Sequence, residues 1–131
     1  MGKNLIIGYA YLVGDPIHRW HIQAMKNAKT LCDVLIVGVL TDKAVMEEKP
    51  KPILSFEERI FIVSELKSVD IVVAQDTYTP KYNCRVIKPD ILFESESHFK
   101  PHKNQFGQTI VLPYFPTQSS TKIKEKIRGQ S

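Results

Sequence analysis

LIIGYAYLVGDPIHRWH, residues 5–21, joins an apolar run to a polar segment that carries two histidines three residues apart. The apolar part, residues 5–13, is rich in Leu, Ile and Tyr and predicts a buried strand. His18 and His21 follow it, at the start of a candidate helix over residues 20–31 whose apolar side chains recur at helical spacing. A strand that leads through a turn into an amphipathic helix is typical of a parallel α/β sheet.

The rest of the chain continues this alternation of apolar runs and amphipathic segments. Further strands are expected at residues 33–40, 71–74, 91–93 and 109–112. Further helices are expected from Ser55, where Ser-Phe-Glu-Glu forms a capping box, from Thr79-Pro80, and from Ser119 or Ser120 to Gly129.

This order of elements predicts an α/β fold. We expect a Rossmann-like three-layer α/β/α sandwich with a mainly parallel five-stranded sheet and right-handed crossovers. Ligands of such sheets bind beyond the carboxyl ends of the strands, near the switch point of the topology. Residues 14–21 and 119–123 are both expected there, so we interpret them as two halves of one site.

The composition is that of a small, mildly basic globular protein. With 131 residues, of which 43% are hydrophobic, the chain is expected to form one domain over residues 1–131. The net charge of +4 suits a nucleotide, a phosphorylated metabolite or a nucleic acid. No apolar run approaches the roughly 18 residues of a membrane span, and the first residues do not resemble a signal peptide. We therefore expect a cytoplasmic protein whose Cys32 and Cys84 are free thiols.

The two histidines can serve phosphoryl transfer. Residues three apart at a helix start lie on one face, so His18 and His21 can reach the same phosphoryl group. When a nucleophile attacks the α-phosphate of a nucleoside triphosphate, donors fixed beforehand stabilise the charge that develops. Ser119, Ser120 and Thr121, at a helix N-terminus, can hold the leaving pyrophosphate. A phosphate or phosphonate acceptor is already ionised, so the reaction requires no catalytic base.

Both fragments resemble motifs of one superfamily. His18-Arg19-Trp20-His21 is similar to the HxGH signature of the cytidylyltransferase-like nucleotidyltransferases, and residues 119–123, SSTKI, are similar to their C-terminal ISSTxI element. The similarity continues through residues 33–39, 55–59, 69–70 and 112–113. It spans nearly the whole chain, at the length of the small bacterial glycerol-3-phosphate cytidylyltransferases.

The resemblance implies transfer of CMP from CTP to a small phosphate or phosphonate acceptor, such as glycerol 3-phosphate, with release of pyrophosphate. Mg²⁺ would be carried by the nucleotide, with no separate metal site in the protein, and the enzyme would be a homodimer without nucleic-acid or membrane partners. Its catalytic residues would be His18, His21 and Arg59, and its acceptor would contact Lys49 and Lys51. The implied nucleotide-binding residues are Val13, Gly14, Asp15, Trp20, Lys67, Tyr114, Ser119, Ser120 and Thr121.

The chain also departs from the family's pattern. Trp20 replaces the glycine between the histidines, and residues 12–15, LVGD, replace Gly-Thr-Phe-Asp. Tyr114 stands where the family has an arginine, and residues 93–98, FESESH, replace a Met-Gly-Asp-type element. The base and the acceptor are therefore not determined by the resemblance.

Three alternatives remain open. The first is an adenylyltransferase that uses ATP with FMN, a pantetheine compound or a nicotinamide nucleotide as acceptor, or a nucleotide-binding relative without activity. The second is a zinc site formed by His18, His21, His98 and His102. The third is a nucleic-acid or regulatory module that uses the basic residues Lys122, Lys124, Lys126 and Arg128.

Overall fold

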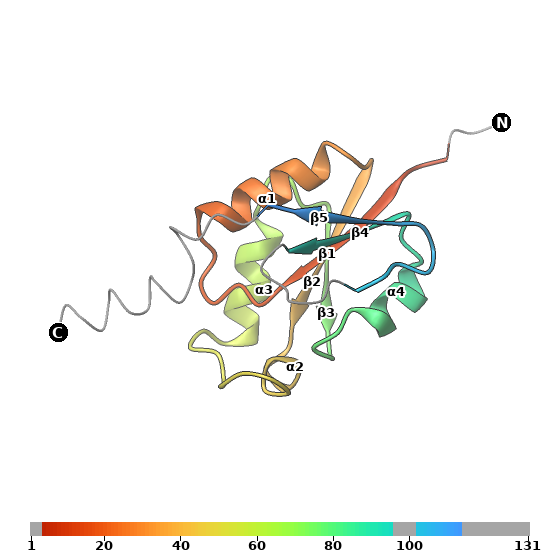
Figure 1. Cartoon of the computed structure of the whole chain (residues 1–131). Helices are drawn as coiled ribbons and strands as arrows, with labels where there is room; N and C mark the ends of the chain where they lie inside the picture. Colours follow the sequence, from red (N-terminus) through yellow and green to blue (C-terminus); the bar gives the residue numbers. More distant parts are fainter. Residues whose placement is uncertain (1–3, 96–101, 114–131) are drawn as a thin grey trace.

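The computed structural model describes residues 4–95 and 102–113, which form a five-stranded sheet with helices on both faces (Figure 1). The strands lie in the order β3-β2-β1-β4-β5, and every neighbouring pair is parallel. The predicted Rossmann-like α/β fold is confirmed, and its sheet is parallel throughout rather than mainly so. The strands are β1 Ile7–Leu12, β2 Val34–Leu40, β3 Ile71–Gln75, β4 Ile91–Ser95 and β5 Gln108–Leu112.

The helices in the described part of the chain are α1 Arg19–Lys29, α2 Asp42–Val45, α3 Phe56–Ser64 and α4 Lys81–Ile87. Ser55 caps α3 as predicted, because its Oγ accepts a hydrogen bond from the Glu58 N–H at 3.2 Å. The sequence did not predict α2, since a single turn has no periodicity to detect. Across residues 4–95 and 102–113, no helix is long and apolar enough to cross a membrane.

The helices divide between the two faces of the sheet (Figure 1). α1 and α3 cover one face over the larger core cluster, and α4 covers the other. β1 contributes to both cores because successive side chains of a strand point to opposite faces: Ala10 and Leu12 face α1 and α3, whereas Tyr9 faces α4. Gly38 in β2 makes room for Tyr9, since a Cβ at this position would collide with the tyrosine hydroxyl.

The topology of the sheet switches between β1 and β4. From β1 the chain moves outward through β2 to β3, with α1 and α3 as crossovers on one face, and then returns past β1 to β4 through α4 on the other. Open α/β sheets bind ligands beyond the carboxyl ends of the strands at such a switch point. A ligand site is therefore expected where the chain leaves β1 and β4.

Candidate functional site

The turn after β1 carries the two histidines to the carboxyl edge of the sheet. Gly14 has φ 71°, a left-handed conformation in which side chains are disfavoured. His18 is extended and precedes Arg19, the first residue of α1. Val13, Gly14 and the histidines therefore lie together at the switch point, as predicted.

His18 and His21 cap the start of α1 reciprocally. His18 Nδ1 accepts a hydrogen bond from the Trp20 N–H at 3.2 Å, and His21 Nδ1 accepts one from the His18 N–H at 3.1 Å. This is a capping box in which histidines replace the usual Ser or Thr and Glu or Gln. Because each Nδ1 accepts, each neutral ring carries its proton on Nε2. The ring centroids are 4.1 Å apart, so the two Nε2–H donors belong to adjacent rings.

Burial keeps both imidazoles neutral. It lowers the pKa of His18, which is only 8% exposed, below the ordinary value. Burial, followed by the neighbouring His18, lowers the pKa of His21 to about 3. At neutral pH the site therefore presents hydrogen-bond donors that carry no formal charge.

Asp15 ties the turn after β1 to the segment before α3. Its carboxylate, 4% exposed, accepts hydrogen bonds from the Ile53 N–H at 2.8 Å and the Leu54 N–H at 2.7 Å. The sequence placed Asp15 among the nucleotide contacts. In the structure this side chain holds two loops of the site together.

Arg59 joins the ends of three elements. Its Nη1 donates to the Val13 carbonyl at 2.9 Å and the Leu40 carbonyl at 2.6 Å, and its Nε donates to the Leu54 carbonyl at 3.2 Å. Nη2 donates to Asp42 Oδ1 at 2.7 Å, and the side chain is fully buried. The guanidinium thus satisfies carbonyls at the ends of β1 and β2. These contacts give Arg59 a positioning role, and its implied catalytic role stays a prediction.

Trp20 links α1 to the end of β5. Its indole Nε1 donates a hydrogen bond to the Pro113 carbonyl at 2.6 Å, and its ring lies edge-on to His21 with centroids 5.4 Å apart. The residue that replaces the family's glycine therefore lies beside the histidine pair. It also fixes the point from which the chain continues toward Tyr114.

The predicted lysines lie at opposite edges of the sheet. Lys49 and Lys51 are exposed in the connection after α2, on the same edge as the histidines. Lys67 is exposed in the turn before β3, at the edge where the parallel strands begin. The structure therefore does not bring Lys67 to His18 within one chain, and the expected nucleotide contact of this lysine stays a prediction.

Some predicted residues lie outside the described part of the chain: Tyr114, Ser119, Ser120, Thr121, His98 and the basic residues between 122 and 128. His18, His21 and His102, the described members of the alternative zinc site, do not form a metal-binding group. Among the residues that the structure describes, no three His, Cys, Asp or Glu side chains are placed to hold a metal ion.

Sequence reasoning missed a second polar cluster, formed by Tyr11, Glu94 and His102. Glu94 is 1% exposed in β4 and hydrogen-bonds with both of the others. A charged residue inside the apolar run of β4 was the available signal.

The fold and the capped histidines define the class: a parallel α/β domain with fixed donors at its switch point. The chain belongs to the cytidylyltransferase-like family, whose model matches residues 14–126. Bifunctional protein HldE of Granulibacter bethesdensis is 32% identical over 133 residues, which cover 95% of this chain and 27% of that protein. The chain thus spans about a quarter of the length of this relative.

Two solved structures share the fold. The lipopolysaccharide core biosynthesis protein from Thermoplasma volcanium has a TM-score of 0.74 at 24% identity, covering 86% of this chain and 98% of that one. Pantoate-β-alanine ligase from Francisella tularensis, solved with β,γ-ATP and β-alanine, has a TM-score of 0.62 at 17% identity. That likeness covers 95% of this chain and 67% of the ligase.

Proposed function

We propose that this domain is a nucleotidyltransferase, which transfers a nucleoside monophosphate from a triphosphate to a small phosphorylated acceptor with release of pyrophosphate. The observation that carries the proposal is the reciprocal cap of His18 and His21, which fixes two neutral Nε2–H donors at the switch point. Membership of the cytidylyltransferase-like family supports the same class of reaction.

The histidine pair acts by electrostatic stabilisation. Charge develops on the non-bridging oxygens of the α-phosphoryl group during transfer, and donors that are already oriented need no reorganisation at that moment. Both rings are neutral before the reaction, so they stabilise the charge without releasing a proton. Lys49 and Lys51, on the same edge of the sheet, are the proposed contacts of the acceptor phosphate.

Mg²⁺ belongs to the proposal as an ion carried by the triphosphate, where it neutralises phosphate charge. The donors at the start of α1 are imidazoles, and Mg²⁺ prefers oxygen ligands. The carboxylate of Asp15 accepts from two backbone N–H groups instead. The phosphates would therefore supply the ion's ligands. Ser119, Ser120 and Thr121 stay the predicted site of the β- and γ-phosphates, and the homodimer also stays a prediction.

For the nucleotide we propose ATP ahead of CTP. The ligase of the same fold was solved with an ATP compound, which supports an adenine nucleotide in this architecture. CTP and glycerol 3-phosphate were expected from the likeness to small cytidylyltransferases, but residues 93–98 depart from the family there. They remain the alternative pair.

A pyrophosphate-release screen tests the reaction. The four nucleoside triphosphates are each combined with glycerol 3-phosphate, phosphoethanolamine, a hexose 1-phosphate, a hydroxyalkylphosphonate, FMN, phosphopantetheine and nicotinamide mononucleotide. We expect release with at least one pair, its loss in His18→Ala, and its retention in Gln23→Ala, a matched change on the exposed face of α1. Nucleotide binding without release in any pair would contradict transfer and favour a non-catalytic relative.

A further inference from the structure

The Tyr11, Glu94 and His102 cluster lies on the face of the sheet opposite α1. Tyr9 in β1 pairs with Leu92 in β4, so Tyr11 and Glu94, two residues further along each strand, stand side by side on the same face. That position is at the carboxyl ends of the two strands between which the topology switches. The cluster therefore borders the region where open α/β sheets bind their ligands.

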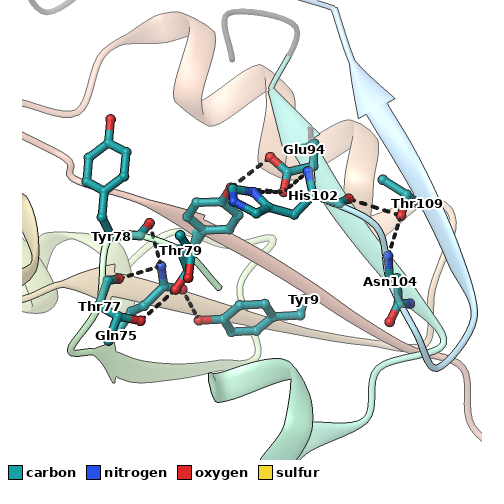
Figure 2. Close-up of polar contacts among 10 residues, drawn as sticks. Tyr9, Gln75, Thr77, Tyr78, Thr79, Glu94, His102, Asn104 and Thr109 are labelled. Carbon is teal, nitrogen blue, oxygen red and sulfur yellow. Dashed lines mark hydrogen bonds and ion pairs between the residues drawn. The ribbon is translucent and has the colours of Figure 1, made fainter. Parts of the chain in front are cut away.

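Hydrogen bonds converge on the Glu94 carboxylate. The Tyr11 hydroxyl donates to Oε1 at 2.7 Å and to Oε2 at 2.9 Å, and the His102 backbone N–H donates to Oε2 at 3.3 Å. His102 Nδ1 lies 3.2 Å from the same Oε2 (Figure 2). Figure 2 shows the Glu94 and His102 side chains pointing toward one another from β4 and from the segment that leads to β5.

Apolar side chains would stabilise this end of the sheet at least as well as the polar cluster does. A buried carboxylate loses its hydration, and an apolar group of similar volume is often at least as stable at such a position. Burial, followed by the nearby Glu94, raises the pKa of Tyr11 far above its ordinary value, so this hydroxyl stays protonated and keeps donating. Buried polar groups arranged at a ligand-binding edge indicate a functional role.

The contacts determine which nitrogen of His102 is available. Tyr11 and the His102 N–H already donate to Glu94, and this favours the ionised carboxylate as acceptor. The proton that lies between His102 Nδ1 and Oε2 is then on Nδ1, and when the ring is neutral its lone pair is on Nε2. The side chain is 24% exposed, and within residues 4–95 and 102–113 no group bonds Nε2. This is the reverse of the histidine cap, whose Nε2 atoms donate.

We infer that His102 Nε2 accepts a hydrogen bond from a hydroxyl of the acceptor, with Tyr11 and Glu94 as the positioning residues that hold this tautomer. The inference rests on the proposed transfer reaction. The attacking and leaving oxygens lie in line across the transferred phosphorus. Because the capped start of α1 holds the nucleotide phosphates, the acceptor approaches from the side of the sheet away from α1. The acceptor class is a phosphate ester that bears hydroxyl groups.

Matched acceptor pairs test this without turnover. Glycerol 3-phosphate is compared with propyl phosphate, which lacks both hydroxyls. Glucose 1-phosphate is compared with cyclohexyl phosphate, which lacks the hydroxyls together with the ring oxygen and the hydroxymethyl group. Dissociation constants are measured by calorimetry on the full chain saturated with a non-hydrolysable nucleotide. We expect the hydroxylated member of at least one pair to bind about 3- to 10-fold more tightly, the range of a single net hydrogen bond.

Two substitutions separate the nitrogens of His102. His102→Asn keeps an amide donor near the position of Nδ1 but has no atom at Nε2, so the preference for hydroxyls should vanish. His102→Gln carries an amide oxygen to the position of Nε2 and should restore part of the preference. Gln105→Ala, an exposed change in the same segment, is the control and should leave the preference unchanged.

Several outcomes overturn the inference: equal affinity within both pairs in the wild-type protein, no binding of either pair, or a preference that persists in His102→Asn. If the His102 variants changed only the relative affinity for different nucleotides, the inference would also be overturned, and His102 would be a contact of the nucleotide base. Its failure is distinguishable from failure of the transfer reaction. Hydroxyl preference without pyrophosphate release leaves the binding role intact, and release without the preference refutes only this role.

Discussion

Each histidine of the cap uses its two ring nitrogens for different purposes. Nδ1 accepts a backbone hydrogen bond that starts α1, and Nε2–H is the proposed donor to a ligand. The structural purpose can be served by other residues, because Glu and Gln are the usual partners at the position that His21 occupies in a capping box. The donor role of Nε2–H cannot be served by Glu, since a carboxylate has no donor and repels phosphate.

His21→Glu should therefore separate stability from turnover. We expect pyrophosphate release to fall by about 100-fold or more, as for the loss of one oriented donor. The free energy of unfolding should change by less than about 1 kcal/mol, because Glu caps the helix and suits its first turn. Steady-state kinetics and urea denaturation measure the two effects. His21→Ala is the comparison, and it should lose about 1 kcal/mol of stability as well. Wild-type turnover in His21→Glu would refute the donor role.

At the scale of elements, Arg59 connects the ends of β1 and β2 to the start of α3. Arg59→Ala would leave the carbonyls of Val13, Leu40 and Leu54 without this donor and Asp42 without its ion-pair partner. We expect a loss of about 3–5 kcal/mol in the free energy of unfolding, because three carbonyls lose their donor and the removal of a fully buried side chain leaves a cavity. Urea denaturation provides the measurement.

Lys67→Ala is the matched control for Arg59, since this basic residue is exposed and lies at the far edge of the sheet. Its stability should change by less than about 0.5 kcal/mol. If Arg59→Ala unfolded at the same urea concentration as Lys67→Ala, and only its KM rose, Arg59 would be a substrate contact after all.

The bond between Trp20 and Pro113 joins α1 to the end of β5, next to the histidines. Trp20 is the only tryptophan of the chain, so its fluorescence reports on this junction alone. With excitation at a wavelength that nucleotides do not absorb, titration with Mg²⁺ and ATP should change the emission, because a ligand at His21 alters the indole's surroundings. An unchanged spectrum at nucleotide concentrations that saturate turnover would place the nucleotide elsewhere.

At the scale of the whole molecule, the partly buried His21 links stability to pH. Its pKa is about 3 in the folded chain, against 6.5 for the ordinary value, so between these values the unfolded state binds more protons. The contribution of His21 to the free energy of unfolding is therefore fully present above about pH 6.5 and decreases as the pH falls toward 3. Urea denaturation from pH 7 to pH 4 should show a shallower decline in His21→Gln than in the wild-type chain. Parallel curves would contradict the buried neutral ring.

Local patterns account for the parts of the structure that the sequence predicted. The strands and the three longer helices have periodic apolar residues, and Ser55 and Pro80 mark helix starts through short-range chemistry. The four-residue α2 has no such period. Arg59 was taken for a group that contacts solvent or substrate, because a sequence does not show that three carbonyls converge on one buried guanidinium.

The amino-acid sequence alone determined the order of elements and the histidine pair at the first turn, because strand period, helix period and capping act over a few residues. Only the tertiary structure decided that β4 lies beside β1. This adjacency brings Tyr11 to Glu94 across 83 positions of chain, and the parallel arrangement leaves Lys67 at the opposite edge from His18. Strand order follows from long-range packing of the crossover helices on the two faces, which no local period encodes.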